Sequence, residues 1–319
     1  MKTVLVEPLT ISQEKLQGLA KELNENGHVF VAYDSKPENT DQWLERTKDA
    51  DQIILANTKM PAEVIKENPK LKYINIAFTG TDHVPVDLAL ERDIIVSNAA
   101  GYSDQGVAEL VIGMTINILR DIKKADWGTR NGMKTSDFLG QEIYGKKVGI
   151  IGTGNIGLRT AELFKAFGAD LYGYNRSQSQ KAKDLGIEFV SLDELLEKSD
   201  IITVHLPLND STRNTIGQAE FAKMKETAIF VNCARGPIVN TEALVDALKN
   251  KKIAGAAIDV YDTEPPFTNG EEILDQDLAL LTPHIAYFTK ESMEKRAAIV
   301  FENALDFLNG REIKTRVDK

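Results

Sequence analysis

The sequence lacks the residues and runs that build disulfides, cysteine-rich metal sites and membrane spans. Cys233 is the single cysteine in 319 residues, which excludes an intramolecular disulfide and a cysteine-rich zinc site. No run approaches the roughly 18 uninterrupted apolar residues of a membrane helix, and the apolar run at 3–6 is too short for a signal peptide. We therefore expect a cytoplasmic protein with no metal centre and no membrane partner.

Positive charge is also in short supply. The chain carries 38 Lys and Arg against 48 Asp and Glu, a net charge of −10. A negative field repels a phosphate backbone, so the composition argues against a nucleic-acid partner, although a local basic pocket remains compatible with one phosphate. Because 42% of the residues are hydrophobic, the length is sufficient for two domains with separate cores.

What the sequence does have is a regular alternation. Short β-branched runs alternate with amphipathic helical windows, a pattern typical of α/β folds with parallel sheets. The first unit shows the rule: a strand is predicted at 3–6, and Ser12 is the expected N-cap of a helix that stops at Gly27. A long helix is predicted over about 103–120, whereas the pattern over 121–144 is weak.

The two ends of the chain are predicted to share one domain. A second α/β series begins at Gly145 and ends near Pro283, and one more helix follows at about 291–309. No further strand is predicted after that helix, so we expect it to pack on the first domain. The predicted division is 1–99 plus 288–319 for one domain and 100–287 for the other.

A glycine-rich loop is the clearest motif. The strand run at 147–151 leads into Gly152-Thr153-Gly154-Asn155-Ile156-Gly157, and helical spacing follows it. The first glycine permits a tight turn, the second lets a pyrophosphate approach the backbone, and the third lets helix pack on strand. Such a motif alone is often an incidental turn. With a strand before it and a second strand at 171–174, it predicts dinucleotide binding.

Three further residues stand where predicted strands end. Arg235, Glu264 and His284 follow successive strands of the second series. Ligands bind at that edge of an open α/β sheet. A guanidinium suits a carboxylate, and a histidine oriented by a carboxylate can protonate the alkoxide that hydride transfer to a ketone creates. Singly, they also fit a surface ion pair, a solvated loop acid and a structural histidine. Their shared position favours a site.

These motifs together resemble the D-isomer-specific 2-hydroxyacid dehydrogenase family. The likeness covers essentially the whole chain, and its motifs are the glycine loop, N-C-A-R-G at 232–236, D-V-Y-D-T-E-P-P at 259–266, L-T-P-H at 281–284, A-G-Y-S-D-Q-G-V-A-E at 100–109 and V-H-L-P-L at 204–208. The resemblance implies two Rossmann-like, doubly wound parallel-sheet domains with the active site in the cleft between them. Residues 1–99 plus 288–319 would form the substrate domain, and 100–287 the nicotinamide dinucleotide domain.

The resemblance also implies a role for each site residue. Arg235 would hold the substrate carboxylate and polarise its carbonyl, His284 would be the acid/base, and Glu264 its partner. The implied cofactor-binding residues are Gly152, Gly154, Asn155, Ile156, Gly157, Asn175, Arg176, Ser177, Leu206, Pro207, Thr212, Cys233, Ala234 and Asp259, the last at the nicotinamide carboxamide. The loop Phe78-Thr79-Gly80-Thr81 would offer backbone N–H groups to the substrate carboxylate. Cys233 is interpreted as a small neighbour of the cofactor, and His28, His83 and His205 as structural.

Two positions depart from the family pattern. Phe78 stands where many relatives carry a small residue, which would reshape the substrate pocket. Asn175-Arg176-Ser177 stands where NAD-dependent members generally place an aspartate that accepts from the ribose hydroxyls. An amide does not repel a 2′-phosphate, and Arg176 and Ser177 can bind one. We therefore expect NADP to be preferred, with NAD as the alternative.

The resulting prediction is reduction of a small 2-keto acid, such as glyoxylate or hydroxypyruvate, to a D-2-hydroxy acid. One alternative is a short phosphoglycerate dehydrogenase, which is less favoured because the sequence ends at Lys319 without the regulatory extension of longer members. Another is a non-catalytic, nucleotide-sensing protein similar to a corepressor. Trp127 and Phe138 lie outside the alternating strand and helix pattern of both predicted sheets. Relatives in the family pair their nucleotide domains through this region, so we expect a homodimer.

Overall fold

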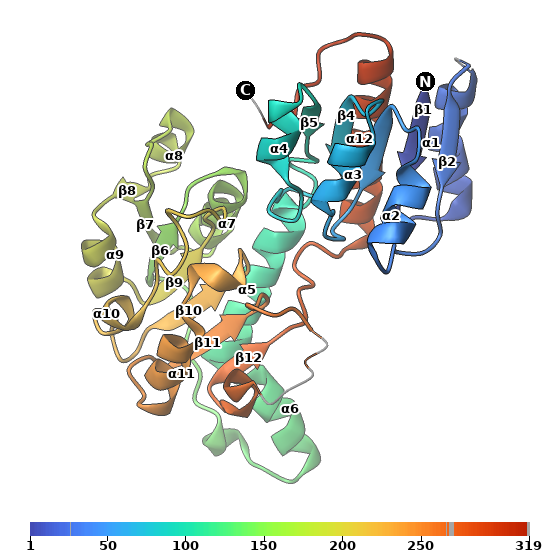
Figure 1. Cartoon of the computed structure of the whole chain (residues 1–319). Helices are drawn as coiled ribbons and strands as arrows, with labels where there is room; N and C mark the ends of the chain where they lie inside the picture. Colours follow the sequence, from blue (N-terminus) through green and yellow to red (C-terminus); the bar gives the residue numbers. More distant parts are fainter. Residues whose placement is uncertain (26, 266, 268–270, 318–319) are drawn as a thin grey trace. The chain divides into compact units, whose positions relative to one another are not determined.

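The chain forms two compact units in a computed structural model that describes residues 1–25, 27–265, 267 and 271–317. Unit 1 comprises Met1–Ser103 with Thr289–Lys319, and unit 2 comprises Asp104–Phe288. Each holds one sheet of parallel strands, so the predicted α/β class with two parallel sheets is confirmed (Figure 1). In the described part of the chain, no helix has the length and apolar character to cross a membrane.

Unit 1 is a five-stranded sheet in the order β2-β1-β3-β4-β5. Its elements are β1 (Lys2–Leu5), α1 (Gln13–Glu25), β2 (Val29–Ala32), α2 (Thr40–Thr47), β3 (Gln52–Leu55), α3 (Ala62–Glu67), β4 (Tyr73–Ile76), α4 (Val86–Glu91), β5 (Ile95–Ser97) and α12 (Lys290–Leu308). The Ser12 hydroxyl accepts a hydrogen bond from the Lys15 N–H at 3.2 Å, as an N-cap does. After α1, Gly27 takes the left-handed backbone (φ +73°) that favours glycine.

The last helix, α12, packs on the sheet of unit 1 (Figure 1). The Phe301 ring meets the Phe30 ring with centroids 5.5 Å apart, and the buried Asn75 side chain donates to the Val300 carbonyl at 2.7 Å. The segment after α12 continues along β5, where the Val317 N–H donates to the Val96 carbonyl at 3.0 Å. The first and last parts of the chain therefore share one core.

Unit 2 is a seven-stranded sheet in the order β12-β11-β10-β9-β6-β7-β8. Its helices and strands are α5 (Asp104–Arg120), α6 (Ile122–Arg130), β6 (Lys147–Ile151), α7 (Asn155–Ala166), β7 (Asp170–Tyr174), α8 (Gln180–Asp184), β8 (Glu188–Phe189), α9 (Leu192–Lys198), β9 (Ile201–Val204), α10 (Gln218–Phe221), β10 (Ile229–Asn232), α11 (Thr241–Lys249), β11 (Gly255–Ile258) and β12 (Ala279–Leu281), with short 3₁₀ turns at Thr135–Asp137, Gly236–Ile238 and Glu272–Asp275. Winding reverses between β6 and β9, the switch point at which such sheets bind ligands.

Both faces of the unit 2 sheet are covered, which explains its nearly continuous apolar strands. On one face Val148 and Ile150 pack with residues of α5 and α7, including Val111 and Phe164. On the other face residues such as Ile151 pack with α9, α10 and α11. A sheet buried on both sides fixes its strand ends rigidly, so loops at those ends have defined positions.

The weakly patterned stretch over 121–144 contains a helix that the sequence analysis did not identify. This helix, α6, buries only Gly128 among its residues, while the Trp127 side chain is 60% exposed. The helix has only nine residues, most of them polar or charged, and a helical period is read over a window of roughly 11–18 residues. The pattern was weak because the helix is short and contains few apolar side chains.

The three glycines of the loop after β6 play different structural parts. Gly152 has φ +96°, and a Cβ there would lie 2.7 Å from the His205 carbonyl oxygen. A Cβ on Gly157 would lie 2.0 Å from the Gly152 carbonyl oxygen, because helix α7 meets the strand there. A Cβ on Gly154 would meet no atom within 4 Å. The first and third glycines are needed by the fold, whereas the second borders open space.

Gly157→Ala is therefore expected to lower the free energy of unfolding by about 1–3 kcal/mol, because a backbone carbonyl must move to admit the methyl group. Gly154→Ala is the matched control and should lose less, within about 1 kcal/mol, because Gly154 is the N-cap of α7 but a Cβ there meets no atom. Denaturant unfolding of the protein without added nucleotide measures both. Equal losses in the two variants would contradict the distinction.

Candidate active site

The three residues predicted from strand ends come to one edge of the unit 2 sheet. Arg235 follows β10, Glu264 follows β11, and His284 follows β12, and these three strands are neighbours in the sheet. Because the strands are parallel, their carboxyl ends meet at the same edge. Pro266, which belongs to the predicted motif around Glu264, lies outside the described residues.

His284 and Glu264 form a close pair. The His284 Nδ1 atom lies 3.1 Å from the Glu264 Oε1 atom, and the histidine side chain is 21% exposed against 44% for the glutamate. The Tyr287 ring meets the imidazole edge-on, with centroids 5.1 Å apart. A carboxylate at Nδ1 fixes the orientation of the ring. The arrangement suits an acid/base whose other nitrogen, Nε2, exchanges the proton.

The backbone that carries His284 is strained and is held by a buried carboxylate. His284 has φ +55°, a left-handed conformation that is uncommon for residues other than glycine. Asp259, which is fully buried, accepts hydrogen bonds from the Thr282 hydroxyl (2.6 Å), the Ile285 N–H (2.8 Å) and the Ala286 N–H (2.9 Å). These bonds enclose His284 on both sides along the chain. Asp259 therefore fixes the turn from which the imidazole projects.

This role of Asp259 was missed by the sequence analysis, which gave the residue only a cofactor contact. Burial raises the pKa of Asp259, and the bonds from the turn offset part of that rise. An acid directly after a buried strand is the signal that was available, because a buried carboxylate must find donors in a neighbouring loop. Which loop supplies them depends on the order of strands in space.

The Arg235 loop is tied to its neighbours through backbone contacts. The Asn232 side chain accepts from the Ala234 N–H and donates to the Arg235 carbonyl, both at 3.0 Å. The half-buried Arg235 guanidinium donates to the Ala234 carbonyl at 2.8 Å. A Cβ on Gly236 would lie 2.0 Å from the Tyr261 carbonyl carbon, so the loops after β10 and β11 touch. A movement of either loop would displace both Arg235 and Glu264.

The predicted nucleotide-binding residues surround the switch point of the same sheet. The Gly152–Gly157 loop follows β6, and Leu206 and Pro207 follow the adjacent β9. The Thr212 hydroxyl donates to the Pro207 carbonyl at 2.6 Å, which shapes that loop. Helix α7 begins at Asn155 and presents its N-terminal N–H groups there. The site fits a pyrophosphate between two strand ends.

Cys233 and Ala234 follow β10 within the same edge. The Cys233 side chain is buried, and its Sγ atom lies 3.9 Å from the Met114 Sδ atom. Burial raises the pKa of the Cys233 thiol well above its ordinary value. A protonated, buried thiol is a small packing residue rather than a nucleophile.

The segment Asn175-Arg176-Ser177 follows β7, next to the glycine loop's own strand. The Asn175 side chain donates to the Ser177 carbonyl at 2.8 Å, while Arg176 and Ser177 are exposed. Lys181 and Lys183 are also exposed on α8, which follows directly. The end of β7 therefore carries three cations and no carboxylate over 175–183.

The predicted substrate loop belongs to unit 1, whereas the residues above belong to unit 2. The Phe78 ring is buried and meets the rings of His83 and Tyr102, with centroids 6.2 and 6.0 Å apart. The Asn98 side chain donates to the Thr79 carbonyl at 2.9 Å. Phe78, Thr79, Gly80 and Thr81 follow β4 at the carboxyl edge of their own sheet.

The other histidines occupy packing positions. His205 Nε2 lies 3.0 Å from the Thr203 hydroxyl. Desolvation of the ring by the surrounding protein disfavours the charged form and lowers the pKa of His205 to about 3. His83 Nε2 lies 2.8 Å from the Ala56 carbonyl oxygen, and His28 Nδ1 lies 3.4 Å from the amino-terminal nitrogen. Each contact fits the structural interpretation.

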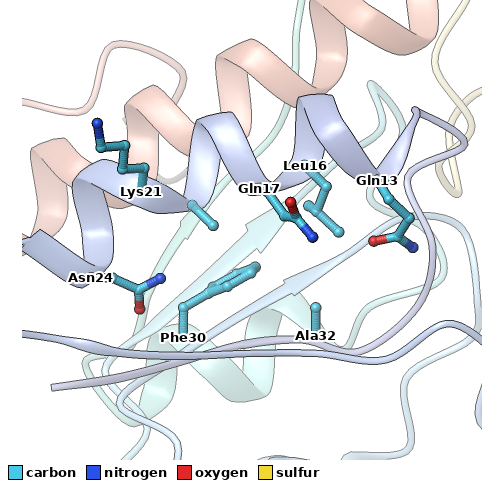
Figure 2. Close-up of a pocket in the computed structure, with 8 residues that line it drawn as sticks. Gln13, Leu16, Gln17, Lys21, Asn24, Phe30 and Ala32 are labelled. Carbon is cyan, nitrogen blue, oxygen red and sulfur yellow. The ribbon is translucent and has the colours of Figure 1, made fainter.

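A hollow of about 620 Å³ lies elsewhere, between α1 and β2 of unit 1 (Figure 2). Its lining residues are Gln13, Leu16, Gln17, Ala20, Lys21, Asn24, Phe30 and Ala32. They include none of the predicted site residues and no acid or histidine for proton transfer. Among the described residues, no group of three or more His, Cys, Asp or Glu side chains is arranged to hold a metal ion.

Comparison with known proteins agrees with this geometry. The sequence model for "D-isomer specific 2-hydroxyacid dehydrogenase, NAD binding domain" matches residues 112–286. The chain is 39% identical to a D-3-phosphoglycerate dehydrogenase of Methanocaldococcus jannaschii over 97% of its length, but it spans only 58% of that protein. It is 36% identical to a glyoxylate reductase of Thermofilum pendens, covering 91% of this chain and 88% of the relative.

Among solved structures, an acyclic imino acid reductase in complex with NADPH and D-Arg is similar with a TM-score of 0.90 and 29% identity, over 99% of this chain and 100% of that one. The glycine loop, the Arg235 strand end and the His284–Glu264 pair all lie within the residues that the family model matches. The chain belongs to the D-isomer specific 2-hydroxyacid dehydrogenase family.

Proposed function

We propose that this protein reduces a small 2-keto acid to the D-2-hydroxy acid with a reduced nicotinamide dinucleotide. The observation that carries the proposal is the His284–Glu264 pair, 3.1 Å apart, on the sheet edge that also presents Arg235 and the glycine loop. The glyoxylate reductase of Thermofilum pendens, which matches most of this chain, supports the reaction class.

Each proposed role follows from charge and position. A bound reduced nicotinamide would supply a hydride for the keto carbon. As the carbon–oxygen double bond becomes an alkoxide, the His284 imidazolium transfers its proton from Nε2 to that oxygen and becomes neutral. Arg235 binds the substrate carboxylate and polarises the keto oxygen, and Glu264 holds the imidazole in position through Nδ1. The products are the hydroxy acid and the oxidised dinucleotide.

We propose that unit 1 is the substrate domain and unit 2 the nucleotide domain. The loop Phe78-Thr79-Gly80-Thr81 would bind the substrate carboxylate through backbone N–H groups. The cofactor would contact the glycine loop, Leu206, Pro207, Thr212, Cys233, Ala234 and Asp259. The Phe78 ring, which is buried against His83 and Tyr102, stands at the start of that loop and would reshape the substrate pocket.

A panel of substrates tests the function directly. Glyoxylate, hydroxypyruvate and pyruvate are expected to support oxidation of the reduced cofactor, with 3-phosphohydroxypyruvate and an imino acid as competing alternatives. Arg235→Lys should lower kcat/KM for the best substrate on the order of 10²-fold or more, because an ammonium cannot span carboxylate and carbonyl together. Absence of turnover with every keto acid would favour a nucleotide-sensing binding protein instead. If the kcat/KM of Arg235→Lys stays within a few-fold of the wild type, Arg235 does not bind the substrate carboxylate as proposed.

The Glu264→Gln variant tests the pair of His284 and Glu264. The amide can still hydrogen-bond the ring but carries no charge, so Glu264→Gln should lower kcat for keto-acid reduction by about tenfold or more. Asp262→Asn, an exposed acid in the same loop, is the control and should leave kcat within about twofold. A kcat of Glu264→Gln equal to that of the wild type would contradict the coupling.

We further propose that NADPH is the preferred cofactor and that NADH is an alternative one. Three exposed cations (Arg176, Lys181 and Lys183) and the Ser177 hydroxyl follow β7, and Asn175 replaces the acid that would repel a 2′-phosphate. The imino acid reductase of similar structure was solved with NADPH.

Arg176→Ala should raise KM for NADPH and leave KM for NADH nearly unchanged, a loss of about 1–3 kcal/mol of charge-assisted hydrogen bonding. Arg311→Ala, which removes an exposed guanidinium paired with Asp306 in unit 1, is the matched control and should change neither value. Steady-state kinetics with each cofactor decides the matter. A wild type that uses NADH at least tenfold better would contradict the proposal.

We propose that the chain forms a homodimer through α6 and the segment after it. The Trp127 side chain is 60% exposed, Tyr144 is 77% exposed and Leu139 is fully exposed, an unusual concentration of apolar surface in one segment. Light scattering at micromolar concentration should give twice the 35.3 kDa chain mass. The monomer mass would refute the dimer.

A further inference from the structure

Unit 1 has a switch point of its own, and the chain itself fills it. The strand order β2-β1-β3 places the reversal between β1 and β3, where a doubly wound sheet ordinarily takes a ligand. The fully buried Glu7 carboxylate occupies that position. It accepts from the Ala56 N–H at 2.8 Å, from the Thr58 N–H at 3.0 Å and from the Thr58 hydroxyl at 2.7 Å. An internal anion thus satisfies the donors that a bound anion would use.

The next strand along the same edge of the sheet is β4, and Phe78 follows its carboxyl end. A buried guanidinium connects this point to the loop after β1. Arg296 of α12 is 3% exposed and donates through Nη2 to the Leu9 carbonyl at 3.1 Å and through Nη1 to the Ala77 carbonyl at 3.4 Å. Charged side chains are rarely buried to this extent without a specific partner or task.

The carbonyl groups of the loop after Ala77 are anchored toward the interior of unit 1. The Phe78 carbonyl accepts from the Ala99 N–H at 2.9 Å, and the Thr79 carbonyl accepts from the Asn98 side chain at 2.9 Å. In a trans peptide the C=O and N–H groups point in opposite directions. Anchoring these two carbonyls therefore turns the N–H groups of Thr79 and Gly80 away from the anchors, where they can meet a ligand.

We propose that Arg296 is a positioning residue for substrate binding, which fixes the loop after β4 through Ala77 and adds positive charge behind its N–H groups. The inference rests on the proposed function, because it takes the substrate carboxylate as the anion that these N–H groups bind. The guanidinium touches no reacting atom. Its contribution is to keep donors aligned before the substrate arrives and to favour an anion over a neutral group.

The test compares Arg296→Met with Arg296→Lys in the full-length chain. Arg296→Met should raise KM for the best 2-keto acid by about tenfold or more, with kcat within about threefold and KM for the nicotinamide cofactor within about twofold. This split is expected because the loop holds the carboxylate equally in the ground and transition states. Arg296→Lys should recover part of the affinity, since an ammonium keeps the charge and can donate to one carbonyl.

Arg46→Met is the matched control. Arg46 is another guanidinium of unit 1 that bridges two carbonyls, those of Val6 (2.8 Å) and Ser35 (2.6 Å), but it does not contact the loop after β4. Its loss should lower thermal stability and leave KM for the keto acid within about twofold. Amide hydrogen exchange without substrate should accelerate at Ala77 and Ala99, whose N–H groups bind the Leu55 and Phe78 carbonyls, in Arg296→Met and stay unchanged there in Arg46→Met.

The outcomes separate this inference from the proposed function. A wild type that reduces no keto acid overturns the function and the substrate part of the inference, while the exchange rates still decide whether Arg296 holds the loop. If the wild type is active, the inference alone is overturned when Arg296→Met leaves KM and hydrogen exchange unchanged. The inference is also overturned when Arg296→Met worsens kcat and both KM values together, or when Arg46→Met raises KM for the keto acid equally.

Discussion

The buried carboxylate of Asp259 is the constraint on which the candidate site depends. It lies at the end of β11 and binds three donors from the loop after β12, so it joins two neighbouring strand ends. The left-handed backbone of His284 costs free energy of roughly 1 kcal/mol or more, which the surrounding bonds must offset. The carboxylate thus helps to hold the imidazole at its distance from Glu264, together with the bonds that Thr282 makes to the Ile258 carbonyl and the Tyr261 hydroxyl.

The two sheets differ at the switch point, where the winding of each sheet reverses. In unit 2 a Cβ on Gly154 would meet no atom within 4 Å, so the loop after β6 borders open space. In unit 1 the Glu7 carboxylate lies at the corresponding point and binds backbone N–H groups there. The same topology therefore gives an open loop in unit 2 and, in unit 1, a strand edge whose donors already bind an internal carboxylate.

Much of the fold was readable from the sequence because its elements satisfy local rules. The strand at 147–151 and the Ser12 cap were predicted where they lie, since periodicity and capping act within a few residues. Helix α6 was not, because it is short and most of its nine residues are polar or charged. The strand ends that carry Arg235, Glu264 and His284 were likewise predicted, because parallel strands place their carboxyl ends at one edge.

The sequence by itself determined the α/β class, the glycine loop and the chemical types available at the strand ends. Only the tertiary structure decided which distant groups share a buried environment. The bonds of Asp259 to the His284 turn, of Glu7 to Thr58, and of Arg296 to Ala77 join residues far apart in the chain. Such pairings depend on strand order and on where α12 packs, and a buried charge takes whichever donors or acceptors that arrangement brings within reach.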